Sequence, residues 1–111
     1  MEWEEIHEEA DLEKINIVSN EQVVLIFKHS TRCAISDTAL NRLERSWKDQ
    51  DAGGIKPFFL DLISHRDISN KIADAYNVKH ESPQALLIKN GQCVFHASHL
   101  SISFNELVKN I

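Results

Sequence analysis

The stretch that most constrains the fold is a continuous apolar run from Val23 to Phe27, which is rich in β-branched residues. A strand with one face in water alternates apolar and polar residues, whereas a strand buried on both faces does not. The run therefore predicts a central strand of a parallel sheet with helices on both faces. Apolar residues at helical spacing from Ile35 to about Lys48 follow it, which predicts a strand-to-helix unit.

The segments around this unit complete an alternating α/β pattern. Gly53-Gly54 predicts a turn that ends the helix, and Pro57 suits the beginning of a strand. Asn90-Gly91 is a strong signal for a two-residue turn between two hairpin strands. The further elements predicted are a short edge strand near Trp3 and Ile6, helices over Ala10 to Val18, Ile68 to Tyr76 and Ser103 to Asn110, and strands over Pro57 to Leu62, Gln84 to Lys89 and Gln92 to Ala97.

This order of elements predicts the type of sheet. A strand-helix-strand crossover joins parallel strands, whereas the hairpin at Asn90-Gly91 joins antiparallel ones. We therefore expect an α/β fold with a central four- to five-stranded mixed sheet flanked by helices on both faces. At 111 residues the chain has the length of one domain, which we expect to span residues 1–111.

Composition and charge argue against several classes of function. The hydrophobic and charged fractions, 42% and 26%, are typical of a globular protein, and the net charge of −5 argues against nucleic acid and anionic membranes as partners. The acidic N-terminus does not suit a signal peptide, and no segment reaches the roughly 18 apolar residues of a membrane span. We therefore expect a cytoplasmic protein, and we expect a monomer.

Cys33 is the candidate nucleophile. It follows the apolar run and precedes the helical pattern, so we expect it at a strand-to-helix turn. There the free N–H groups and the dipole of the helix favour a thiolate, which is the reactive form, and Arg32 acts in the same direction. Asp37, in the first helical turn, acts against the thiolate because it adds negative charge.

Ser36 stands three residues after Cys33, where a second cysteine would complete a Cys-x-x-Cys redox pair. The motif is therefore a one-thiol version of that pair, Cys-x-x-Ser. Two roles are open for the Ser36 hydroxyl. It can satisfy backbone N–H groups at the helix start, or it can donate a hydrogen bond to the Cys33 thiolate.

Other cysteine and histidine residues invite a functional interpretation that we do not favour. Cys93 follows the hairpin turn, far in sequence from Cys33, so we do not expect it to resolve a Cys33 disulfide. Cys93, His96 and His99 resemble metal ligands only superficially, because Cys93 and His96 point to opposite faces of a strand, and we expect no metal site. His29 could favour the thiolate if cationic, but we expect a surface or packing residue.

The order of elements resembles the thioredoxin fold. That superfamily places its active cysteine at the first strand-to-helix turn, the position of Cys33, and a cis-proline before the hairpin, the position of Ser82-Pro83. The run Ser30 to Ser36, with the sequence Ser-Thr-Arg-Cys-Ala-Ile-Ser, is similar to the signature of the bacillithiol-system redox proteins of the YtxJ type, the monothiol bacilliredoxins. Ala34 departs from this signature, which usually has proline after the cysteine.

This resemblance implies a set of partners and site residues. Bacillithiol would be the co-substrate, with no tightly bound cofactor, and the partners would be S-bacillithiolated proteins and low-molecular-weight thiols. The residues implied are Cys33 and Ser36 in catalysis, and Thr31, Arg32, Ser82 and Pro83 in binding the substrate or the small thiol.

Three functions fit these observations. The first is a monothiol thiol-disulfide oxidoreductase that removes bacillithiol from cytosolic proteins through a mixed disulfide on Cys33. The second is an iron–sulfur cluster carrier like the monothiol glutaredoxins, whose Cys-Gly-Phe-Ser motif shares its first and last residues with Cys33 to Ser36. The third is a non-catalytic thioredoxin-like module that holds a partner near Pro83.

Overall fold

A computed structural model describes all 111 residues, from Met1 to Ile111. Its centre is one five-stranded sheet with the strand order β1-β3-β2-β4-β5. The strands are β1 (Glu4–Glu5), β2 (Val24–His29), β3 (Lys56–Asp61), β4 (Gln84–Lys89) and β5 (Gln92–Ser98). The helices are α1 (Ala10–Val18), α2 (Ala34–Ser46), α3 (Arg66–Tyr76) and α4 (Phe104–Lys109), with short 3-10 helices η1 (Asp49–Asp51) and η2 (His99–Ser101).

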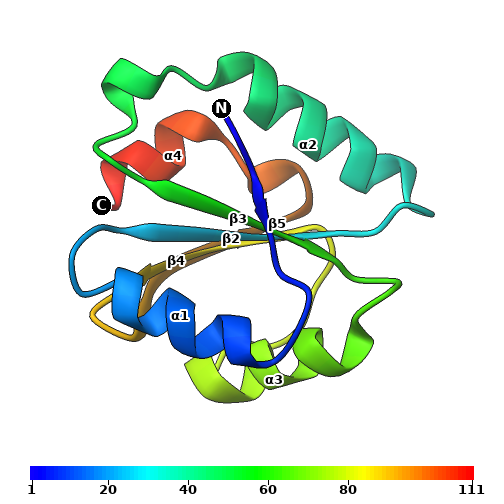
Figure 1. Ribbon diagram of the computed structural model, residues 1–111. Coiled ribbons are helices and arrows are strands. Elements are labelled where there is room, and N and C mark those ends of the chain that lie inside the picture. The colour runs from blue at the N-terminus through cyan, green and yellow to red at the C-terminus, as the bar shows by residue number, and fades with distance from the viewer.

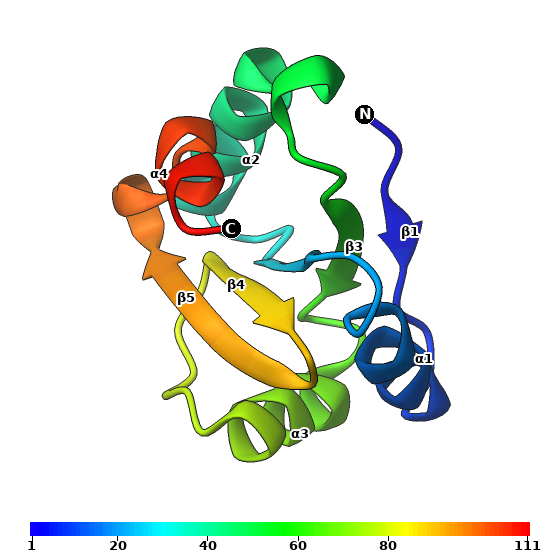
Figure 2. The same ribbon diagram turned by 90° about the vertical axis from the view of Figure 1, so that its left-hand side faces the viewer.

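The sheet is mixed. β3 lies between β1 and β2 and is parallel to both, whereas β4 is antiparallel to β2 and to β5. Helices α2 and α4 cover one face of the sheet, and α1 and α3 cover the other (Figure 1). Figure 2 shows β1 at the margin of the sheet beside β3. The predicted α/β class, the mixed sheet and the helices on both faces are confirmed.

The strand β2 is buried along its whole length, as its apolar run predicts. Its alternate side chains enter two separate cores. Val24 and Ile26 pack with α1 and α3, whereas Leu25 and Phe27 pack with α2 and α4. One strand thus joins both helical layers to the sheet, and its end fixes where α2 begins.

The limits of several elements differ slightly from those predicted. β2 continues past Phe27 through Lys28 and His29, both of which are buried. The helix α2 ends at Ser46 because Trp47 turns to an extended backbone, and the Trp47 ring packs on Phe104 with ring centroids 4.9 Å apart. Tertiary packing therefore overrides the local apolar pattern at both of these ends.

Lys28 is fully buried and has no carboxylate partner. Its Nζ donates to the Ser69 carbonyl at 3.2 Å, and it lies 3.3 Å from His80 Nδ1. Burial lowers the pKa of Lys28 to about 8. Burial likewise lowers the pKa of His80, and the Lys28 charge adds to the effect. These contacts tie the end of β2 to α3 and to the loop that precedes β4.

The helix α2 begins without a side-chain hydrogen bond at its N-cap residue. Cys33 is the N-cap, with extended backbone angles (φ −119°, ψ 117°), and its carbonyl accepts the Asp37 N–H at 3.1 Å. Ala34 is therefore the first helical residue, whose N–H has no partner inside the helix. The geometry at Cys33 also suits a residue that precedes proline.

None of the helices combines the length and the apolar character that crossing a membrane requires.

Replacing Lys28 with methionine should stabilise the protein at neutral pH by about 1–2 kcal/mol, since a buried charge is removed and the volume is kept. The pH dependence should change as well. Between about pH 8 and 10.5 the folded wild type loses the Lys28 proton while the unfolded chain keeps it, so the free energy of unfolding rises with pH. Denaturant unfolding at several pH values should show that this rise is smaller in Lys28→Met. Parallel curves for the two proteins would contradict the buried charge.

Replacing Ala34 with proline should be tolerated and should raise the free energy of unfolding by about 0.4–1 kcal/mol, because proline restricts the unfolded chain and suits the first helical position. Thr38→Pro is the matched control, since it interrupts the same helix one turn later and should cost about 3 kcal/mol. Thermal unfolding measures both. A loss of stability in Ala34→Pro would show that this helix start has another geometry.

Candidate active site

Cys33 and Pro83 lie at the same end of the sheet. Lys28 near the end of β2 pairs with Gln84 at the start of β4, so the loop after β2 and the loop before β4 emerge together (Figure 1). The Ser82–Pro83 peptide is cis, and the Pro83 carbonyl accepts the His99 N–H at 3.0 Å. The candidate site is therefore built from the start of α2, the Pro83 loop and η2.

Cys33 is a free thiol and is half-buried. Its side chain does not cap the helix, so its sulfur makes no hydrogen bond to the first turn of α2. Its backbone is fixed on both sides, because its N–H donates to the Ser30 carbonyl at 3.2 Å and its carbonyl accepts from Asp37. Cys33 is thus held at the helix start as a partly exposed residue.

Ser36 is fully buried, and its hydroxyl points into the protein. The oxygen accepts the Ser30 N–H at 3.0 Å and lies 2.7 Å from His29 Nδ1. This geometry provides the backbone role that the sequence left open, because the hydroxyl holds the loop before Cys33. A hydrogen bond from Ser36 to the thiolate is not formed in this arrangement.

His29 is a buried packing residue, one of the two roles expected from the sequence, and its ring also contacts Ser36 and Asp37. The ring is packed near Phe59 and Phe27, with centroid distances of 5.5 and 6.4 Å. Only 7% of its side chain is exposed, and Nε2 lies 3.4 Å from Asp37 Oδ1. No sequence pattern predicts that His29 contacts Ser36 and Asp37, because only the turn between β2 and α2 brings these residues together.

The four residues implied in binding surround Cys33 in different ways. Thr31 and Arg32 are exposed in the turn before Cys33. Ser82 is partly buried, and its hydroxyl oxygen is buried without a hydrogen-bond partner, whereas Pro83 is buried. The structure thus brings all four to the end of the sheet that holds Cys33, and their roles in binding stay predictions.

Cys93 lies far from this site. It pairs with Ile88, which in turn pairs with Val24 at the start of β2, whereas Cys33 follows the other end of that strand. The strand length from Val24 to His29 alone is about 17 Å. Cys93 packs against the core beneath α1 and α3, its thiol donates to the Phe95 carbonyl at 3.3 Å, and burial raises its pKa. Cys93 therefore lies outside the candidate site.

The chain contains no cluster of three or more histidine, cysteine, aspartate or glutamate side chains that could hold a metal ion. His96 and His99 instead line a shallow groove beside Glu81. A hydrogen bond from Ser98 and the charges of His99, Lys79 and His96 lower the pKa of Glu81.

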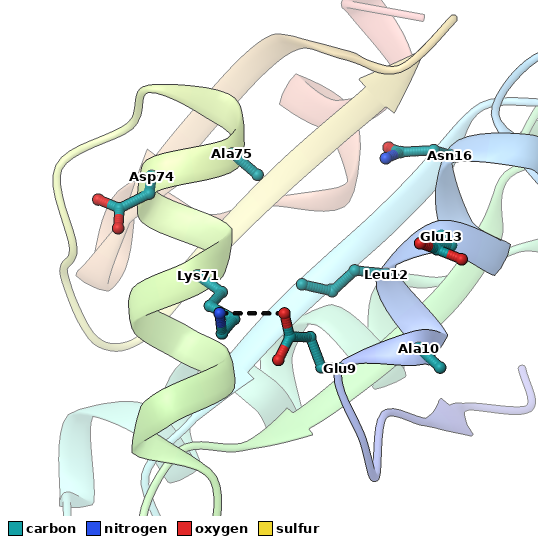
Figure 3. A pocket seen from close by; sticks show the side chains of 8 residues that line it. All are labelled: Glu9, Ala10, Leu12, Glu13, Asn16, Lys71, Asp74 and Ala75. Atoms are coloured by element: carbon teal, nitrogen blue, oxygen red, sulfur yellow. Dashed lines mark ion pairs between the residues drawn. The ribbon is translucent and has the colours of Figure 1, made fainter.

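The groove between α1 and α3 is of another kind (Figure 3). It has a volume of about 640 Å³ and is bridged by an ion pair between Lys71 Nζ and Glu9 at 3.0 Å. Its lining holds neither cysteine nor histidine, and it lies on the face of the sheet opposite α2. It therefore offers no group for thiol chemistry.

Comparisons with known proteins support the resemblance both to the thioredoxin fold and to the monothiol bacilliredoxins. The family model described as monothiol bacilliredoxin BrxC matches residues 4–107. A solved structure of a protein described as having a thioredoxin fold is 31% identical, with a TM-score of 0.80 over 96% of this chain and 90% of that one. Thioredoxin from Malassezia sympodialis, 13% identical, superposes with a TM-score of 0.75 over 96% of this chain and 91% of that chain, which shows the shared fold.

The family match spans β1 to α4 and includes Cys33, Ser36 and Pro83. This chain belongs to the monothiol bacilliredoxin family BrxC.

Proposed function

We propose that this protein is a monothiol thiol-disulfide oxidoreductase that removes bacillithiol from S-bacillithiolated cytoplasmic proteins. The Cys33 thiolate attacks the bacillithiol sulfur of the mixed disulfide. A new S–S bond forms between Cys33 and bacillithiol, the original S–S bond breaks, and its electron pair leaves on the cysteine of the target protein as a thiolate.

The observation that carries this proposal is the placement of one accessible thiol beside a serine. Cys33 is half-buried at the start of α2, position 36 holds Ser36, and the second thiol lies at the other end of the sheet. An internal disulfide at the site is therefore impossible, so the mixed disulfide persists until another thiol attacks it. A second bacillithiol would release Cys33 as a thiolate and leave as bacillithiol disulfide, which a separate reductase would reduce.

The surface around Cys33 suits a protein substrate. Ile35, two residues after Cys33, is 47% exposed, and Leu100 of η2 is 54% exposed. The two elements are neighbours, since Arg42 of α2 donates to the Leu100 carbonyl at 3.4 Å. We expect these apolar side chains to contact the target protein, and Arg32 to attract the carboxylates of bacillithiol.

Replacing Cys33 with serine should reduce de-bacillithiolation to the uncatalysed rate, because serine cannot form the mixed disulfide. The measurement follows the mass of an S-bacillithiolated target protein over time in the presence of bacillithiol. Cys93→Ser is the matched control and should retain the wild-type rate, since this thiol lies outside the site. Full activity of Cys33→Ser would contradict the proposal.

Replacing Ser36 with cysteine should convert the site to a two-thiol site. A thiol three residues along a helix is within disulfide reach, so it should attack the Cys33 mixed disulfide and expel bacillithiol. Mass spectrometry after exposure to bacillithiol disulfide should then find an internal disulfide in Ser36→Cys and a stable Cys33 adduct in the wild type. Equal adducts in both proteins would mean that position 36 does not face the reacting sulfur.

A further inference from the structure

A chain of polar contacts runs from the loop before Cys33 to the first turn of α2. The Ser30 N–H donates to Ser36 Oγ at 3.0 Å, Ser36 Oγ lies 2.7 Å from His29 Nδ1, and His29 Nε2 lies 3.4 Å from Asp37 Oδ1. Ser36 is fully buried and His29 nearly so. None of these contacts is part of the thiol exchange proposed above.

The donors and acceptors in this chain favour one arrangement of protons. An ionised Asp37 only accepts, so its contact at 3.4 Å favours the neutral His29 tautomer with its single N–H on Nε2. Nδ1 then carries a lone pair and accepts the hydroxyl proton of Ser36. The Ser36 proton is therefore engaged in the interior of the protein and is not directed at Cys33.

The imidazole is held in this orientation from several sides. Phe27 and Phe59 pack near its ring, and α2 supplies Ser36 and Asp37. The remaining charged group beside it is Asp61, at the paired position of β3, whose carboxylate accepts from Ile63 N–H and Ser64 Oγ. His29 is thus a fixed acceptor for the Ser36 hydroxyl.

Ser36 has a second acceptor within reach of its position in the helix. Cys33 is the N-cap and Ser36 is the third helical residue. A side chain at that position lies on the same side of the helix start as the N-cap side chain, as the second cysteine of a Cys-x-x-Cys redox pair does. His29 Nδ1 and a Cys33 thiolate therefore compete for one hydroxyl proton.

We propose that His29 is a positioning residue that withholds the Ser36 proton from Cys33 and so limits the fraction of thiolate. This inference deepens the proposed function and rests on Cys33 being its reacting thiol.

The test is a double-mutant cycle in the Cys93→Ser background, so that only one thiol titrates. In His29→Phe the Ser36 hydroxyl loses its acceptor and turns to Cys33. The ratio of thiolate to thiol at a fixed pH, measured by ultraviolet absorbance, should rise about tenfold, as expected for one hydrogen bond to a charged group. In the Ser36→Ala background the same replacement should leave the ratio unchanged. An unchanged ratio with Ser36 present, or an equal rise in both backgrounds, would overturn the proposal.

A measurement on the wild type keeps the test independent of how the variants fold. The ¹⁵N chemical shifts of the His29 ring distinguish the two neutral tautomers. We expect the Nε2–H form, with Nδ1 unprotonated, and an Nδ1–H form would overturn the proposal because the Ser36 proton would then be free. Both measurements use no bacillithiol, so a failure of de-bacillithiolation with the expected ratios would reject the proposed function alone.

Discussion

The burial of β2 on both faces is the constraint on which the rest of the structure depends. Val24 and Ile26 hold the layer of α1 and α3, and Leu25 and Phe27 hold the layer of α2 and α4. Because both cores meet on this strand, its position cannot shift without disturbing both layers. The chain leaves the end of this strand through one short turn and enters α2, so the place of Cys33 follows from packing that lies several residues away. The packing of the two cores around β2 therefore fixes the position of Cys33 at the start of α2.

The last two residues of the same strand give this end of the molecule its polar character. Lys28 points to the α1–α3 side, where it contacts α3 and His80, and His29 points to the α2 side, where it contacts Ser36. Burial of a lysine without a carboxylate is costly, and Lys28 retains its place through hydrogen bonds alone. Together the two side chains link the end of β2 to α3 and the loop before β4 on one face of the sheet, and to the start of α2 on the other. Stability and reactivity at this end of the sheet thus depend on polar contacts made by neighbouring residues of one strand.

The sequence predicted the architecture well because its signals were local and strong. An uninterrupted apolar strand, the turn at Asn90-Gly91 and the position of Cys33 each depend on a few neighbouring residues, and each is found as expected. The burial of Lys28 could not be predicted, since a lysine normally indicates a strand that has ended, and for His29 the sequence left a surface role and a packing role open. The direction of the Ser36 hydroxyl was also undecided, because its partners come from the far side of the turn. Sequence reasoning therefore missed the polar contacts between residues on opposite sides of the turn. The position of Cys33 could be predicted without knowing these contacts.

The most direct test of the central claim is the site and identity of the first adduct. The protein is exposed to bacillithiol disulfide and, in parallel, to glutathione disulfide, and the products are analysed by intact mass and peptide mapping. The account predicts one bacillithiol adduct, on Cys33, that forms faster than the glutathione adduct, with Cys93 unmodified. Slow and equal labelling of Cys33 and Cys93, or no adduct on Cys33, would mean that the thiol at the start of α2 is not activated and would contradict the account.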